Sequence, residues 1–168
     1  ILVPCSFSTL SIASASSGAT KVKETRPLEN FGIQEVPHKK YLNDFLTGKY
    51  PDSFARGELY NDDPRLGDAR LCGTTASLCG IERFGFEGNQ EGVDRAVRYD
   101  ITLHAFMLSQ SGIPVIYSGD EIGQVNDYSY KDDPEKSDDS RYLHRGKFDW
   151  KLAENRHDPA TVQGKLFP

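Results

Sequence analysis

Residues 112–121 read GIPVIYSGDE, and this stretch decides the fold that the sequence predicts. Residues 114–117 combine β-branched and aromatic side chains without a charge, which is typical of a strand buried on both faces. Gly119 follows at the point where such a strand would end. The stretch therefore predicts a short buried strand.

A helix is predicted just before this strand, from Glu91 to Gly112. Its apolar positions recur at intervals of four, four, four and three, at Val93, Val97, Ile101, Ala105 and Leu108. That spacing is typical of the buried face of an amphipathic helix, and Gly112 with Pro114 supplies the stop. Helix, tight turn and buried strand in succession indicate α/β architecture.

The remaining segments predict less regular structure. Residues 1–30 are expected to form a disordered leader, and order is expected to begin near Phe31. Residues 39–48 predict a short helix ended by Gly48, residues 49–73 predict turns, and residues 74–85 permit a helix. Residues 122–150 predict a long acidic loop.

Composition excludes several classes of function. The net charge is −5 over 168 residues, so the basic surface that attracts nucleic acid is not expected. No apolar run approaches the about 20 residues that a membrane span needs, so we expect a soluble protein, with the compartment left open. Cys5, Cys72 and Cys79 fit neither a zinc site nor a redox pair and are expected to be free thiols.

Carboxylates and histidines offer few candidates for chemistry. Asp120 and Glu121 are adjacent, but successive strand residues point to opposite faces, so we expect them to anchor a loop and not to form a glycosidase pair. The acidic loop lacks the glycine and the closing glutamate of a calcium loop, and the four histidines are scattered. No metal site is expected.

Three arginines near aromatic and acidic residues remain, at Arg56, Arg70 and Arg141. A guanidinium offers five donors in a planar fork, which suits the adjacent hydroxyls of a sugar, and Tyr142 could stack on a pyranose ring. The alternative is an arginine paired with a neighbouring aspartate on a solvated loop, where ion pairs contribute little.

The motifs GIPVIYSGDEIGQVND and KSDDSRYLHRG resemble the eighth strand and following loop of the α-amylase family of glycoside hydrolases, in particular the amylosucrases. FGIQEVPHKKYLNDF, SFARGELY, GDARLCGTTASLCGIE, AVRYDITLHAFMLSQSGIP and RHDPATVQGKLF follow the order and spacing of that subfamily. The resemblance covers about residues 31–167.

This resemblance implies part of a (β/α)8 TIM barrel: its last helix–strand units within residues 31–168, with an insertion at about 34–85 that follows strand seven. Amylosucrases transfer a glucosyl unit from sucrose to an α-glucan by a retaining mechanism, without a metal or organic cofactor. Sucrose and α-glucans are therefore the expected partners.

The resemblance also assigns binding residues. Arg141 matches the arginine that, paired with an aspartate from an early strand, closes the glucosyl pocket. Arg70 matches an arginine at the acceptor or fructosyl subsite. Lys39 stands where the family has an acceptor-site arginine, which keeps the charge but loses the bidentate fork.

The chain departs from the family by lacking the catalytic carboxylates. No HDD motif precedes Phe31, and 168 residues fall short of the ~250 of a full barrel. We therefore expect a fragment that is inactive alone and that self-associates through exposed barrel edges. A fragment of a sucrose hydrolase, an isomerase or an α-amylase-type glycosidase, and a non-catalytic carbohydrate-binding module, are the alternatives.

Overall fold

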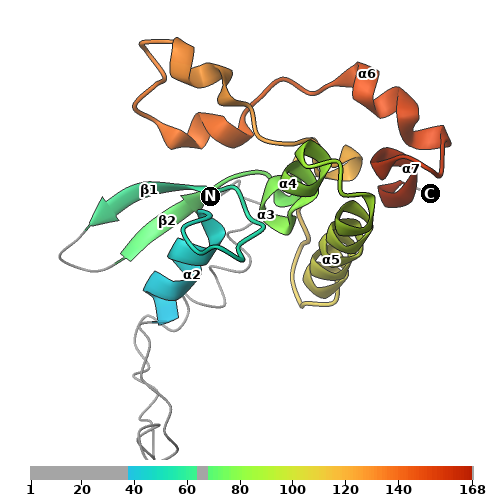
Figure 1. Ribbon diagram of the computed structural model, residues 1–168, viewed down its shortest axis with the longest axis horizontal. Helices are drawn as coiled ribbons and strands as arrows, with labels where there is room; N and C mark the ends of the chain where they lie inside the picture. The colour runs from blue at the N-terminus through green and yellow to red at the C-terminus, as the bar shows by residue number, and fades with distance from the viewer. Residues whose placement is uncertain (1–37, 64–67, 168) are drawn as a thin grey trace, which may run out of the picture.

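The computed structural model describes residues 38–63 and 68–167, so the expected leader lies outside the described residues. The one two-stranded sheet of the described residues lies at one side of the molecule, with the helices beside it (Figure 1). The α-helices are α2 (His38–Leu46), α3 (Thr75–Cys79), α4 (Ile81–Phe86), α5 (Gln90–Leu108), α6 (Trp150–Ala153) and α7 (Val162–Leu166). The strands are β1 (Glu58–Asp63) and β2 (Asp68–Cys72), and the 3-10 helices are η2 (Asp120–Ile122), η3 (Tyr128–Asp132), η4 (Ser140–His144) and η5 (Glu154–His157).

The prediction of a partial (β/α)8 barrel is wrong. In the described residues the only sheet is the antiparallel pair β1–β2, with no parallel strands. Residues 113–117, the predicted buried strand, form no regular element, and Ile113 is 92% exposed. A barrel strand needs a hydrogen-bonded neighbour on each side, and the described chain supplies none here.

The main core lies where α3, α4, α5 and α7 meet. Its buried members are Ala76, Ile81, Val93, Ala96 and Val97, and Phe84, Val162 and Leu166 pack against them. The predicted helix is confirmed as α5, which Asn89 caps by accepting the Gly92 N–H at 2.9 Å. Its predicted apolar face is buried only in the first half.

The second half of α5 does not pack as expected. Ile101 is 43% exposed and Leu108 is 53% exposed, although both lie on the predicted buried face. The helix also ends at Leu108, four residues before Gly112. Apolar spacing fixes which face a helix would bury, but burial itself requires a partner element, and α4 and α7 cover only the first half.

Two smaller predictions are confirmed. The helix predicted at residues 39–48 is α2, which begins one residue earlier at His38, and Gly48 follows its end with φ of 75°, a left-handed conformation that glycine adopts readily. Residues 74–85 form α3 and α4, with the break between them at Gly80, whose φ is 99°. A Cβ at Gly80 would lie 3.0 Å from the Phe84 ring and 3.1 Å from Phe54. Glycine therefore permits both the turn and the packing.

The β1–β2 hairpin was missed, because only turns were predicted for residues 49–73. Its register places Tyr60 opposite Arg70 and Leu59 opposite Leu71. Leu71 packs with Leu46 of α2 against the second buried cluster, Ala55 and Leu78. Residues 123–149 cross the other side of the hairpin, as the orange segment of Figure 1 shows.

Asn126 holds this crossing segment in place. Its side-chain oxygen accepts the Thr74 N–H at 2.8 Å, and its side-chain nitrogen donates to the Arg56 carbonyl. Its backbone N–H donates to Ser77 Oγ at 2.9 Å. The residue is 7% exposed. One buried residue therefore joins the crossing segment to the start of α3 and to Arg56, two residues before β1.

We predict that Asn126→Ala lowers the free energy of unfolding by roughly 2–4 kcal/mol, because at least two buried backbone groups lose their partner. Urea unfolding followed by circular dichroism measures this. Asn155→Ala, on an exposed part of η5, is the matched control and should change stability little. Equal stability of the two variants would contradict the role given to Asn126.

Candidate functional site

The hairpin presents one apolar and one polar face. Side chains alternate along a strand, so Leu59 and Leu71 share one face while Tyr60 and Arg70 share the other. Glu58 lies two residues before Tyr60 and so on the same polar face. The crossing segment covers this polar face, and the candidate site forms at their junction.

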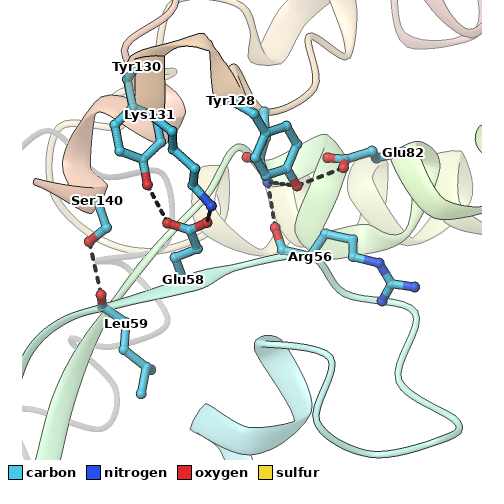
Figure 2. Close-up of polar contacts among 9 residues, drawn as sticks. Arg56, Glu58, Leu59, Glu82, Tyr128, Tyr130, Lys131 and Ser140 are labelled. Atoms are coloured by element: carbon cyan, nitrogen blue, oxygen red, sulfur yellow. Dashed lines mark hydrogen bonds and ion pairs between the residues drawn. The ribbon is translucent and has the colours of Figure 1, made fainter. Parts of the chain in front are cut away.

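Polar contacts fix the crossing segment on β1 (Figure 2). Tyr130 and Lys131 both donate hydrogen bonds to the Glu58 carboxylate, and Ser140 Oγ donates to the Leu59 carbonyl at 2.9 Å. Tyr130 is buried, and this burial, with the Glu58 carboxylate beside it, raises the pKa of its hydroxyl. These contacts place η4, and therefore Arg141, against the hairpin.

Arg141 is held between a carboxylate and an aromatic ring. Its Nε lies 2.8 Å from Asp139 Oδ1 and its Nη2 lies 2.7 Å from Asp139 Oδ2, while the guanidinium lies 4.6 Å from the Tyr60 ring centroid. The hydrogen bonds from Arg141 hold the pKa of Asp139 below its usual value. The Arg141 side chain is still 43% exposed, so the pair is open to a ligand.

A second aromatic ring adjoins this pair in sequence. Lys136 Nζ lies 5.8 Å from the Tyr142 ring centroid, and the Arg145 guanidinium lies 5.6 Å from it. Cations within about 6 Å of a ring face are attracted by its quadrupole. The Tyr142 ring, which was expected to stack on a sugar, therefore lies close to Lys136 and Arg145.

Two of the three predicted binding residues, Arg70 and Arg141, lie beside Tyr60. Arg70 is exposed and lies directly opposite Tyr60 in the sheet register, and Arg141 lies over the same ring. Lys39 belongs to α2, where the structure describes its backbone but not its side chain. The Arg56 guanidinium instead donates a hydrogen bond to the Ala55 backbone carbonyl at 2.8 Å.

The partner of Arg141 differs from the one that the family resemblance implies. The carboxylate is Asp139, two residues away, and not an aspartate from an early strand. This is the neighbouring-aspartate alternative left open by the sequence. Tyr60 was not predicted, because nothing in ELYNDD marks it, whereas the Asp-x-Arg spacing of residues 139–141 could have identified Asp139.

A separate polar cluster connects α5 to η2. His104 Nδ1 lies 2.7 Å from Asp100 Oδ1, and its Nε2 lies 3.7 Å from Asp120 Oδ2, with both carboxylates buried. Hydrogen bonds to Asp100 first, and to Asp120 second, raise the pKa of His104 to about 10. Burial raises the pKa of Asp100. His104 is therefore an ion-pairing residue that joins two elements.

Asp120 and Glu121 have different partners, but they lie in the 3-10 helix η2 and not at the end of the strand from which their divergence was predicted. Asp120 faces His104, whereas the Glu121 carboxylate accepts the Gly119 N–H at 2.8 Å and so anchors its own turn. Cys79 is a free thiol, as expected, and burial raises the pKa of this thiol; Cys72 is also buried. Cys5 lies outside the described residues.

Residues 38–63 and 68–167 show neither a metal-binding group nor a membrane-spanning helix. They contain no group of three or more His, Cys, Asp or Glu side chains placed to hold a metal ion. None of their helices is both long and apolar enough to cross a membrane. Comparison of the whole sequence with models of known protein families found no match.

We predict that the His104 cluster makes stability depend on pH. The folded pKa of about 10 exceeds the unfolded value of 6.5, so the stabilisation is complete below pH 6.5 and is lost as pH rises through 10. His104→Gln should remove most of this dependence, and His157→Gln, on exposed η5, should retain it. Denaturant unfolding at pH 6, 8 and 10 measures it, and parallel curves for wild type and His104→Gln would contradict the pairing.

Proposed function

We propose that this chain binds the glucosyl unit of sucrose or of an α-glucan at the cluster of Tyr60, Arg70, Asp139 and Arg141, and that it does not transfer that unit by itself. One observation carries the proposal. Of the two arginines that the amylosucrase resemblance assigns to sugar subsites, Arg141 lies over the Tyr60 ring and Arg70 is the sheet partner of Tyr60, although the chain separates the two arginines by 71 positions.

The chemistry of the cluster suits a neutral polyol. Asp139 balances the charge of Arg141, and their pairing uses only some of the five guanidinium N–H donors and of the carboxylate lone pairs. Adjacent sugar hydroxyls can donate to the carboxylate and accept from the guanidinium. The carboxylate also fixes the plane of the guanidinium before a sugar arrives, which reduces the entropy lost on binding.

The same geometry argues against catalysis at this cluster. A general acid for glycoside cleavage must hold a proton near neutral pH, so its pKa must be raised. Arg141 lowers the pKa of Asp139, which keeps this carboxylate ionised. Glu58, the nearby carboxylate of β1, is engaged by Tyr130 and Lys131. Neither group is arranged as an acid/base.

The alternative specificities share this binding step. A fragment of a sucrose hydrolase, a sucrose isomerase or an α-amylase-type glycosidase would bind the same glucosyl ring, and a carbohydrate-binding module would do so as its whole function. Comparing glucose, sucrose and maltotriose separates them, since preference for sucrose favours the first two and preference for maltotriose favours the last two.

We predict that Arg141→Ala weakens sugar binding at least tenfold, a loss of about 1.4 kcal/mol or more. The substitution removes the guanidinium donors, whose plane Asp139 fixes before the sugar binds. Tyr60→Ala should have a similar effect, and Tyr60→Phe a small one. Isothermal titration with sucrose and maltotriose measures the affinity.

Arg98→Ala is the matched control, because Arg98 is exposed on α5 and should leave affinity unchanged. The proposal would be contradicted if the wild-type chain bound neither sugar, or if Arg141→Ala bound sugar with the same affinity as the wild type.

We predict that the purified chain releases no fructose from sucrose above a protein-free blank. The reason is that the cluster offers no carboxylate with a raised pKa. Fructose is measured enzymatically after long incubation at high protein concentration. Turnover that persists in Arg141→Ala would mean a contaminant, whereas turnover that Arg141→Ala abolishes would overturn the claim of inactivity.

A further inference from the structure

Tyr41 of α2 and Tyr50 of the loop after α2 bring their rings together at the surface. The ring centroids lie 5.2 Å apart, with an angle of 41° between the ring planes. Tyr41 is 41% exposed and Tyr50 is 37% exposed. Every other ring contact found within residues 38–63 and 68–167 includes a phenylalanine or a histidine. This contact therefore combines two phenol groups with access to solvent.

Polar contacts hold the loop that carries Tyr50 against the end of α2. The Lys49 N–H donates to the Asp44 carbonyl at 2.9 Å, and Lys49 Nζ lies 3.2 Å from Asp44 Oδ1. On the other side of Tyr50, Ser53 Oγ donates a hydrogen bond to the Phe45 carbonyl. The chain is thus fastened to α2 both before and after Tyr50. The two rings are therefore held together before any reaction takes place.

We propose that Tyr41 and Tyr50 form a site of oxidative modification, at which a haem peroxidase with hydrogen peroxide joins the two rings by a carbon–carbon bond. Loss of one electron and one proton from each phenol leaves a radical whose unpaired electron lies partly on the ring carbons next to the C–O carbon. One Cε atom of each ring then forms the bond, and the hydrogen of each joined carbon moves as a proton to the phenol oxygen. The electrons and protons removed reduce one hydrogen peroxide to two waters, so the product is lighter than the chain by two hydrogen atoms.

The geometry favours coupling within one chain over coupling between two chains. Two radicals that are already in contact do not have to meet by diffusion, which is the proximity advantage of an intramolecular reaction. Tyr99 lacks this advantage. It is 42% exposed, but its ring contacts Phe54, which carries no phenol. Exposure alone therefore does not make a coupling site, and Tyr99 serves as the matched control for Tyr41 and Tyr50.

The new bond ties the first turn of α2 to the loop that follows the helix. α2 has nine residues, and a helix of this length is marginal without contacts to other parts of the chain. Closing the loop between residues 41 and 50 lowers the conformational entropy of the unfolded segment, which stabilises the helix. Neither tyrosine belongs to the cluster of Tyr60 and Arg141, so this proposal and the proposed function can fail independently.

Treatment of the full chain with peroxidase and hydrogen peroxide, followed by trypsin, tests the site. Trypsin cuts after Lys40, Lys49 and Arg56, so each tyrosine of the pair leaves in its own peptide, residues 41–49 and residues 50–56. Mass spectrometry of the monomer should find these two peptides joined, at their summed mass less two hydrogen atoms.

Tyr41→Phe and Tyr50→Phe keep the rings and remove one phenol, and each should lower the yield of dityrosine fluorescence in the monomer about tenfold or more. Tyr99→Phe should keep the wild-type yield, and dilution of the protein should leave this yield unchanged. The proposal would be overturned by a wild-type monomer without the joined peptides, by a Tyr50→Phe monomer that keeps the fluorescence, or by a yield that falls in proportion to dilution.

Discussion

The buried side chain of Asn126 is the interaction on which the rest of the structure depends. It joins the crossing segment to the Thr74 N–H at the start of α3 and to the Arg56 carbonyl before β1. Leu143 and Tyr130 are buried apolar side chains of the crossing segment, and its polar contacts fix it on α3 and β1. Because Ser140 and Tyr130 then bond to β1, Arg141 comes to rest over Tyr60. The candidate site exists only while this docking holds.

The helical core and the candidate site rest on different kinds of interaction. The core of α3, α4, α5 and α7 is apolar, whereas the site rests on hydrogen bonds and on the exposed Arg141–Asp139 pair. Exposed ion pairs contribute little to stability, so variants of Arg141 should leave the core intact. His104 connects this core to η2 and the turn before the crossing segment. Packing also joins the two regions, because Leu71 of β2, Leu78 of α3 and Leu103 of α5 belong to one apolar cluster.

Local signals in the sequence predicted the helices well and the sheet badly. Val93 and Val97 fixed α5, and Gly48 marked the end of α2, because helix formation depends on neighbours three or four residues away. The strand predicted at residues 113–117 failed because a strand depends on a distant partner that the described chain does not provide. β1 was missed because ELYNDD has neither alternation nor β-branched residues. Arg141 was found through a family resemblance, whereas Tyr60 could be found only from the fold.

The most direct measurement is the observation of nuclear Overhauser effects between an unlabelled maltotriose ligand and the isotope-labelled chain. The account predicts contacts from sugar ring protons to the aromatic protons of Tyr60 and to the side-chain protons of Arg141, with no contacts to the core around Val97. Contacts confined to another surface, such as the exposed ring of Trp150, would contradict the assignment of the site.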